Sequence, residues 1–392
     1  MQSKPHLLLL DALRGVAALI VLYYHCFECF GYEIAESTGL YTQHCDHGYL
    51  AVDFFFLLSG FVIAYAYDDR WQSVKKKVAR ELSAEQRGMS LITFFKRRLI
   101  RLHPMVIAGA VIGLACYLLD GGTNWEGNPA TAGNIALVFF MTLVMLPVFP
   151  GWGADVRGNG EMFPLNGPQW SLFFEYIGNI FYALLLRRLS TRALACVTAA
   201  CGIVLGAHVL QIGYLGEGWS FVDNGFTWGL LRMLFPYALG MLLCRIFLKK
   251  RSESEPNSHN RGFMSTFIAC SAALIVLLPV PFVGNPAHPW QNGLYILFLT
   301  MLVFPVIIWA AASAGTGKNK LCMFLGEISY PLYIVHYPLM YMFYRYHGFP
   351  NVTCTMGDVW PMAVATFFGS IVLATVFLYC YDKPLRRWLS KK

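Results

Sequence analysis

The chain has 392 residues, of which 57% are hydrophobic and only 13% are charged. This composition excludes an ordinary soluble globular protein, because such a protein needs far more charge to cover its surface. The net charge of +8 does not indicate nucleic-acid binding, since the lysines and arginines stand in short stretches between apolar runs. That arrangement is typical of loops that anchor membrane helices, so we expect a polytopic protein whose main partner is the lipid bilayer.

Eleven apolar runs are long enough to be candidate spans. The first, Leu7 to Phe30, has no small-residue cleavage site and carries charged residues, so it is predicted to be a retained span rather than a signal peptide. The runs cover about residues 8-27, 48-67, 104-119, 132-149, 170-186, 193-212, 226-248, 263-283, 292-312, 322-344 and 361-381.

Five basic stretches predict the topology of these runs. They lie at 75–101, 187–192, 249–251, 318–320 and 386–392, and the positive-inside rule assigns all five to the cytoplasm. Between two stretches on the same side, the chain must then cross the membrane an even number of times. The interval from Arg101 to Arg187, however, contains three candidate spans. We assign 132-149 as a re-entrant or interfacial segment because it runs into a Gly/Pro-rich loop. The prediction is an all-α bundle of about ten transmembrane helices with both termini cytoplasmic.

The chain is predicted to form a single membrane domain over residues 1-392. Its longest cytoplasmic stretch is the basic loop 68-103, and no appended soluble domain is expected. The eleven cysteines follow no zinc or redox spacing, and no metal site is predicted. A disulfide between Cys45 and Cys354 on the outer side stays open.

The first span, DALRGVAALIVLYYH, carries Asp11, Arg14 and His25. Eleven steps of 100° bring Arg14 and His25 to within about 20° of one another on the helix, roughly 16 Å apart along its axis. Charge inside a span is costly, which favours a functional role for this face. The alternative is that Arg14 reaches back to the headgroups while His25 sits near the outer interface.

Four further motifs follow in the chain, and each places polar groups on one helical face. Asp53 precedes a run of phenylalanines and Ser-Gly-Phe; Arg98 and Arg101 are three residues apart; Trp170 and Ser171 precede Glu175; and Ser329, Tyr333 and His336 share a face of the tenth span.

Structural roles compete with functional ones at each motif. Ser59 and Gly60 favour close helix packing, the arginines can serve as cytoplasmic anchors, and the face of Glu175 can act as polar glue between helices. His336 can be a buried neutral histidine that bonds a backbone carbonyl near a proline. Arg232 and His208 are minor candidates for the same polar cavity.

Taken together, the Arg-x10-His, Asp-Phe…Ser-Gly-Phe, Arg-x-x-Arg, Trp-Ser-Leu-x-x-Glu and Gly-x-Ile-Ser-Tyr…His-x-Pro motifs resemble the acyltransferase-3 family over about residues 7 to 388. The resemblance implies a ten-helix membrane O-acyltransferase, most simply an O-acetyltransferase, in the bacterial inner (cytoplasmic) membrane. It implies transfer from acyl-CoA, as donor substrate rather than permanently bound cofactor, to a hydroxyl of a carbohydrate such as exopolysaccharide or lipopolysaccharide, which can be lipid-linked. One departure follows Glu175, where Asn179 is the nearest polar substitute for the family's next acid or amide.

Topology and resemblance together assign roles. Arg14, Arg98 and Arg101 are expected to hold acyl-CoA. Arg14 is also expected to be catalytic together with His25, which would act as general base or transient acyl carrier. Glu175 or Asp53 is expected to orient the imidazole. The acceptor is expected to contact the polar groups of two later spans: Trp170, Ser171, Ser329, Tyr333 and His336.

Two other classes of function remain open. One is a proton-coupled transporter or flippase of an envelope precursor, with Asp53, Glu175 and His336 as a relay, although no internal repeat supports it. The other is a structural or sensory membrane protein with a packed polar core.

Overall fold

The computed structural model describes residues 5–31, 46–71, 89–149, 151–253, 262–315, 317–346 and 356–391. Cys45 and Cys354, whose pairing was left open, lie outside these residues. In the described part of the chain all regular structure is helical, as predicted, apart from two isolated β-bridges. The helices in chain order are α1 (Leu8–Cys26), α3 (Ala51–Tyr67), α4 (Leu91–Leu119), α5 (Ala132–Leu143), α6 (Gln169–Leu184), α7 (Thr191–Ile212), α8 (Gly225–Glu253), α9 (Phe263–Leu277), α10 (Trp290–Phe298), α11 (Phe304–Ser313), α12 (Lys320–Tyr346), α13 (Met356–Phe377) and α14 (Lys383–Lys391).

Short helical segments extend several of these helices. They are η1 (Phe27–Gly31), η2 (Gly48–Leu50), η3 (Asp68–Trp71), η4 (Leu186–Arg188), η5 (Val222–Asn224), η6 (Leu299–Val303) and η7 (Leu378–Asp382). Because η6 joins α10 to α11 and η7 joins α13 to α14, each of these pairs forms one continuous rod.

Seven helical rods of the described residues are long and apolar enough to cross a membrane, judged by length and composition. They are Leu8–Phe30, Gly48–Trp71, Leu91–Leu119, Thr191–Ile212, Val222–Glu253, Trp290–Ser313 and Val359–Lys391. Helices α6, α9 and α12 lie in the same bundle outside this set, so the number of ten spans stays a prediction. Helix α5 has 12 residues and is about 18 Å long, too short for a hydrocarbon core of about 30 Å.

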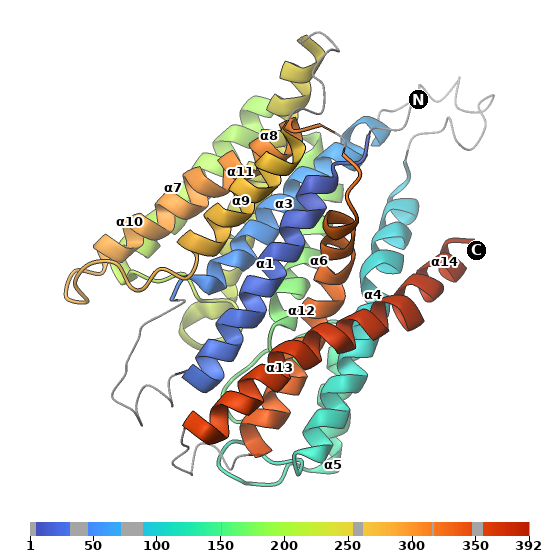
Figure 1. The fold of residues 1–392 in the computed structure, drawn as a ribbon, viewed down its shortest axis with the longest axis vertical. Coiled ribbons are helices and arrows are strands. Elements are labelled where there is room, and N and C mark those ends of the chain that lie inside the picture. The colour runs from blue at the N-terminus through green and yellow to red at the C-terminus, as the bar shows by residue number, and fades with distance from the viewer. Residues whose placement is uncertain are drawn as a thin grey trace.

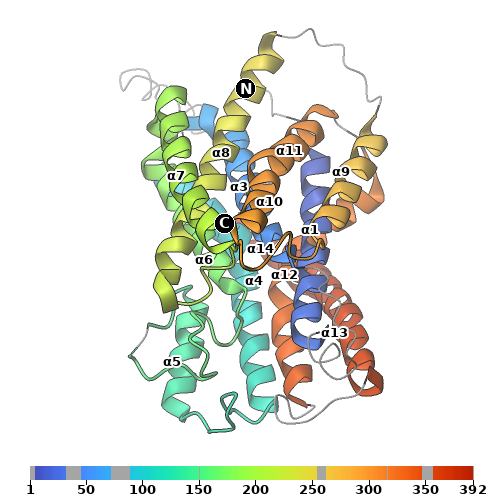
Figure 2. The same ribbon diagram turned by 90° about the vertical axis from the view of Figure 1, so that its left-hand side faces the viewer.

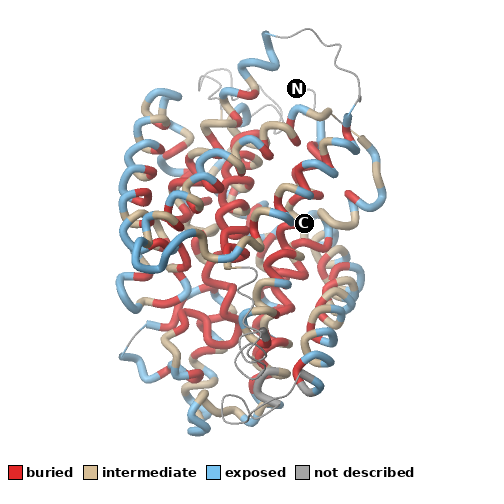
Figure 3. Tube along the Cα trace, turned by 60° about the vertical axis from the view of Figure 1, so that its left-hand side comes forward, coloured by how far each residue is buried: buried red, intermediate tan, exposed pale blue. Residues whose placement is uncertain are grey.

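Helix α1 contacts α3, α9, α11, α12 and α13, and Figures 1 and 2 show it running along the length of the bundle. Helix α1 packs along α12 and α3 packs along α8, while α13 and α14 run obliquely across the other helices in Figure 1. Buried residues concentrate along the inner helices, and exposed residues lie on the outer faces of the peripheral helices (Figure 3). This is the pattern expected of a bundle with a packed interior.

Glycines set the two closest helix contacts. A Cβ atom on Gly15 of α1 would lie 2.3 Å from the carbonyl oxygen of Leu325 on α12. A Cβ atom on Gly60 of α3 would lie 2.0 Å from the carbonyl oxygen of Tyr237 on α8. No side chain fits at such distances, so the backbones approach as closely as they do only because glycine stands there. The expectation that Gly60 serves close packing is confirmed.

Contacts between helix ends bring two of the basic stretches together. Arg245 near the end of α8 donates to Asp68 at 3.1 Å and to the carbonyl oxygen of Leu189 at 2.8 Å. The stretches at 187–192 and 249–251 therefore lie at one end of the bundle, as the positive-inside assignment requires. The side of the membrane that this end faces stays a prediction.

Candidate active site

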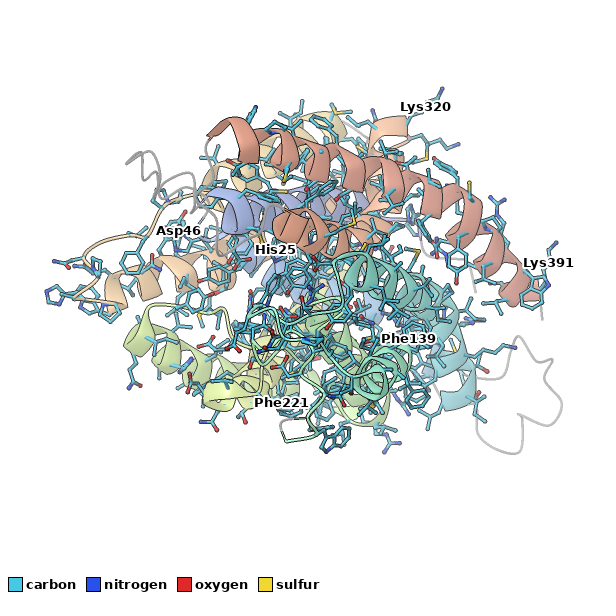
Figure 4. All side chains as sticks on the ribbon, turned by 90° about the horizontal axis from the view of Figure 1, so that it is seen from below. His25, Asp46, Phe139, Phe221, Lys320 and Lys391 are labelled. Atoms are coloured by element: carbon cyan, nitrogen blue, oxygen red, sulfur yellow. The ribbon has the colours of Figure 1, made fainter. Side chains whose placement is uncertain are left out.

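His25 ends α1 at the opposite end of the bundle and contacts His336 of α12. The Nδ1 atom of His25 lies 2.9 Å from Nε2 of His336, and the two rings stack with centroids 5.1 Å apart. Figure 4, viewed from this end, shows His25 inside the ring of helices. The two histidines are 311 positions apart in the chain, so only the packing of α12 on α1 brings them together.

The partners of His336 determine which nitrogen atoms carry protons in this pair. Nδ1 of His336 lies 3.0 Å from the carbonyl oxygen of Leu332, which can only accept a hydrogen bond. Nδ1 of His336 therefore donates, and its Nε2 accepts from Nδ1–H of His25. This assignment leaves a lone pair on Nε2 of His25. The pair thus has the arrangement of a base and the group that orients it.

His25 lines a cavity of about 400 Å³, here called the histidine cavity. Eight of its lining side chains are tyrosines or tryptophans, and its ionisable groups besides His25 include Glu28, Glu161 and Arg232. An aromatic wall with a few polar groups is the usual character of a small-molecule site. The aromatic residues are Tyr24, Tyr49, Trp125, Trp170, Tyr214, Trp219, Tyr337 and Tyr341.

Asp53 does not line the histidine cavity but pairs with Arg232, which does. Nε of Arg232 lies 3.1 Å from both carboxylate oxygens of Asp53, and a second guanidinium nitrogen lies 2.8 Å from Oδ2. The same guanidinium donates to the carbonyl oxygens of Tyr49 and Glu217 at 3.1 and 3.0 Å. Both side chains are buried, so Asp53 compensates the charge of Arg232.

A second cavity, of about 810 Å³, lies toward the other end of α1 and is here called the arginine cavity. Arg14, Arg98 and Arg101 all line it, so residues of two separate sequence motifs meet in this cavity. Its remaining ionisable lining residues are His6, Asp11, Glu175, Lys318, Glu327, Asp382 and Arg386.

The carboxylates of the arginine cavity are occupied by neighbouring cations. Arg14 contacts Asp11, Arg386 lies 2.5 Å from Asp382, and Lys383 lies 2.7 Å from Glu327. Among the described residues, Arg101 and Lys318 line the cavity without an ion-pair partner. The cavity therefore carries positive charge that an anionic ligand can neutralise.

Glu175 belongs to the arginine cavity rather than to His25. Its Oε1 atom accepts from Arg98 at 2.8 Å and from the hydroxyl of Ser59 at 3.1 Å. From the sequence, Glu175 or Asp53 is expected to contact His25 and orient its imidazole. His336 makes that contact instead, because each carboxylate is engaged by its own arginine. A role for Glu175 or Asp53 in orienting His25 has no contact in the structure to support it.

Three of the expected acceptor residues lie between the two cavities. Ser171 and Tyr333 line the arginine cavity, whereas Trp170 lines the histidine cavity. The hydroxyls of Ser171 and Tyr333 are 2.6 Å apart and hydrogen-bond to each other, and each lies 3.1 Å from the carbonyl oxygen of Pro168, which accepts from the hydroxyl whose proton is left. Because Pro168 lines the histidine cavity, this hydrogen-bonded group joins the linings of the two cavities. Ser329 lines the arginine cavity and donates to the carbonyl oxygen of Gly326 at 2.8 Å.

Sequence reasoning missed the loop between α5 and α6. Glu161 is buried there and accepts a hydrogen bond from Tyr341 of α12. Asn166 in the same loop donates to the carbonyl oxygen of Ile334 at 2.9 Å. Pro338 lacks the N–H that would otherwise bond this carbonyl, so the proline offered a signal that a capping partner was needed. Nothing in the spacing of the loop pointed to Glu161.

The minor candidates separate in the structure. Arg232 lines the histidine cavity, as described above, whereas His208 stacks on Trp228 and lies 2.7 Å from Glu217 outside both cavities. Within the described ranges, no group of three or more His, Cys, Asp or Glu residues is arranged to hold a metal ion.

Comparison with known proteins relates this geometry to a family. The acyltransferase-3 model, described as an acyltransferase domain, matches residues 7–379. Protein 2 in the picA locus of Rhizobium radiobacter is 33% identical over 211 residues, which cover 52% of this chain and 95% of that protein. No solved structure matches the chain.

Longer relatives carry a functional name. The O-acetyltransferase OatA of Staphylococcus aureus (strain NCTC 8325 / PS 47) is 23% identical over 358 residues, which cover 88% of this chain and 53% of OatA. A putative O-acetyltransferase of Staphylococcus aureus (strain COL) is 24% identical over 356 residues, covering 86% of this chain and 51% of that protein. The chain therefore spans about half the length of these O-acetyltransferases.

Proposed function

The chain belongs to the acyltransferase-3 family of membrane acyltransferases, and from this premise we propose that it moves an acyl group from acyl-CoA in the arginine cavity to a hydroxyl in the histidine cavity. The observation that carries the proposal is the pairing of His25 with His336 at one cavity, while Arg101 lines the other and has no ion-pair partner in the described part of the chain. The acyl group that we propose is acetyl, because the relative OatA is named an O-acetyltransferase.

The arginine cavity suits the phosphates of coenzyme A. Guanidinium groups bind phosphate oxygens with paired hydrogen bonds, and Arg101 and Lys318 are not committed to carboxylates within the described residues. The same charges make this end of the bundle the cytoplasmic one, because acyl-CoA is made in the cytoplasm and basic residues remain there. The protein would then reside in the inner membrane of a bacterium, with both termini on the cytoplasmic side.

His25 supplies the base for the transfer. Its Nε2 lone pair takes the proton of the acceptor hydroxyl as the hydroxyl oxygen attacks the thioester carbon. The carbon–sulfur bond breaks as the ester bond forms, and the proton on Nε2 passes to the departing thiolate sulfur. His336 keeps Nδ1–H of His25 bonded throughout, which stabilises the imidazolium and holds the ring in place. Ser171 and Tyr333 join the linings of the two cavities, so the pantetheine arm has to pass beside them.

The acceptor we propose is a hydroxyl of a surface or exported carbohydrate. Aromatic rings present flat apolar faces to the C–H faces of sugar rings, and the histidine cavity is walled by such side chains. A cavity of about 400 Å³ accommodates one or two sugar rings rather than a polymer. The acceptor would therefore be the end of a glycan chain or a lipid-linked sugar unit.

Acyl transfer in proteoliposomes tests the proposal. The full chain would be reconstituted with radiolabelled acetyl-CoA on one side and total envelope glycan on the other, and covalent, alkali-labile label would be counted. His25→Ala is expected to lower the rate by about 10²–10⁴-fold, the usual contribution of a positioned base. The exposed His288 lies outside both cavities, so His288→Ala is the matched control.

A second pair of variants tests the donor site. Arg101→Gln removes a cation of the arginine cavity. It is expected to raise the KM for acetyl-CoA by roughly 10- to 100-fold, the contribution of one hydrogen bond to a charged group. Arg97→Gln is the control, because Arg97 is exposed on the same helix and does not line the cavity. Transfer that survives His25→Ala would refute the assignment of the base. Solute movement without any covalent product would favour the transporter instead.

A further inference from the structure

Glu161 is a buried carboxyl group in the wall of the histidine cavity that the proposed chemistry does not use. It is 6% exposed and lies in the loop between α5 and α6. Its Oε1 atom accepts from the hydroxyl of Tyr341 and from the amide of Asn159 at 3.1 Å. Its Oε2 atom is buried and has no hydrogen-bond partner among the described residues. A buried carboxylate oxygen without a partner is unfavourable, because it has lost its hydration, and a bound hydroxyl would supply the missing hydrogen bond.

The surroundings fix this carboxyl group in place. The backbone at Glu161 pairs with Ser220 in an isolated β-bridge. Arg157 of the same loop is buried, lies 2.9 Å from Asp120, and places its guanidinium 4.5 Å from the ring centroid of Tyr341. The orientation of Glu161 is therefore determined from two sides, as a binding group requires.

A line of aromatic rings connects Glu161 to the base. The ring centroid of His25 lies 4.8 Å from that of Tyr337, which lies 4.5 Å from that of Tyr341, the donor to Glu161. Gly167 packs directly against this line, because a Cβ atom there would lie 2.8 Å from the ring of Tyr337 and 3.4 Å from Oε1 of Glu161. Since His25 and Glu161 line the same cavity, a ligand ring held there can lie close to both the base and the carboxyl group.

The charges of the histidine cavity also restrict the ligand. Glu28 and Glu161 both line it, and in the described part of the lining Arg232 is the only lysine or arginine. The guanidinium of Arg232 is already bonded to Asp53 and to two backbone carbonyl oxygens. A ligand carboxylate or phosphate would therefore meet like charge and lose its hydration without gaining an ion pair.

We propose that Glu161 positions the acceptor, its Oε2 atom accepting a hydrogen bond from one hydroxyl of an uncharged sugar ring while a neighbouring hydroxyl faces His25. The same carboxyl group makes the cavity select against rings that carry a carboxylate or phosphate. This inference rests on the proposed function for the identity of the reaction, but its binding step can be measured without any acyl transfer.

Protection of Cys29 from alkylation measures occupancy of the cavity. Cys29 lines the histidine cavity, whereas the exposed Cys196 of α7 does not and serves as the internal control. The purified full chain in nanodiscs would be treated with N-ethylmaleimide, and labelling of each cysteine peptide would be followed by mass spectrometry. The probes are methyl β-glucoside and methyl β-glucuronide, which differ only in the carboxylate at C6.

For the wild type we expect the glucoside to protect Cys29 at a concentration at least about fivefold lower than the glucuronide. Glu161→Gln keeps the size of the side chain but removes the charge, so it is expected to need roughly tenfold more glucoside and to lose most of the preference. Glu126→Gln, at an exposed position in a nearby loop, is expected to behave as wild type. A thermal melt of each variant would confirm that it is folded.

Three results would overturn the inference: equal protection of the wild type by the two glycosides, protection by neither, or an unchanged preference in Glu161→Gln. These results are separable from failure of the proposed function. Transfer activity that depends on His25 while glycoside preference does not depend on Glu161 would leave the acyltransferase assignment intact. Selective protection in a protein without transfer activity would leave the binding role of Glu161 intact and contradict the acyltransferase assignment.

Discussion

Removal of the Asp53 carboxylate is expected to damage the fold before it affects the chemistry. Asp53 and Arg232 are 2% and 1% exposed, and Asp53→Ala would delete three close guanidinium–carboxylate contacts. The guanidinium would stay buried with only carbonyl partners. Breaking a buried ion pair from one side costs about 3–5 kcal/mol, which shifts the unfolding equilibrium by a factor of roughly 10² to 10⁴.

Unfolding of the purified chain in mixed micelles with increasing dodecyl sulfate, followed by tryptophan fluorescence, would measure this loss. The double variant Asp53→Leu with Arg232→Met removes both charges at similar volume and should regain most of the stability. Glu253→Ala, at the exposed end of α8, is the control. The reasoning is refuted if Asp53→Ala is as stable as the wild type. A stable but inactive Asp53→Ala protein would instead favour the catalytic role expected from the sequence.

Further expectations concern the histidine pair, a helix contact and pH. His336→Phe removes the acceptor for Nδ1–H of His25 and should lower kcat roughly 10- to 100-fold, whereas His336→Gln should recover part of it; full activity of the Phe variant would contradict this. Gly15→Ala places a methyl group 2.3 Å from a carbonyl oxygen of α12 and should lower the free energy of unfolding by about 1–3 kcal/mol. Gly369→Ala is the control, because a Cβ atom there would have nothing within 4 Å. Equal melting temperatures of the two variants would contradict this expectation. Burial raises the pKa of Glu161 to about 7. Protection of Cys29 by the glucoside should therefore strengthen as the pH rises through 7 and the carboxylate forms, whereas Glu161→Gln should not show this change. The same pH dependence in both proteins would refute the role of Glu161. The ionisable groups that face Glu161 are Tyr341, Arg157, Asp155, Tyr337, Glu28 and Cys29.

Length, composition and helical periodicity were enough to predict much of the architecture. The chain is helical in its described part, the run at 132-149 forms the short α5, and Arg14, Arg98 and Arg101 line one cavity. These features follow from the periodicity of a single helix or from the cost of placing charge in lipid. Both can be read from the order of residues within one segment of the chain. The family was predicted in the same way, because its motifs are local in the sequence.

Pairing between helices could not be predicted in this way. Periodicity shows which residues share a face, but the rotation and depth of a helix against its neighbours depend on packing, such as the contact of Gly15 with α12. That packing gives His25 a histidine as partner, while Asp53 and Glu175 are engaged by Arg232 and Arg98.

The loop that carries Glu161 has no periodicity at all, so its contribution to the histidine cavity was invisible in the sequence. The sequence alone determined a helical membrane protein with a cationic site and a histidine on one helical face. Only the tertiary structure decided which groups meet, because those contacts join residues as much as 311 positions apart, whose approach depends on the fit of helix against helix.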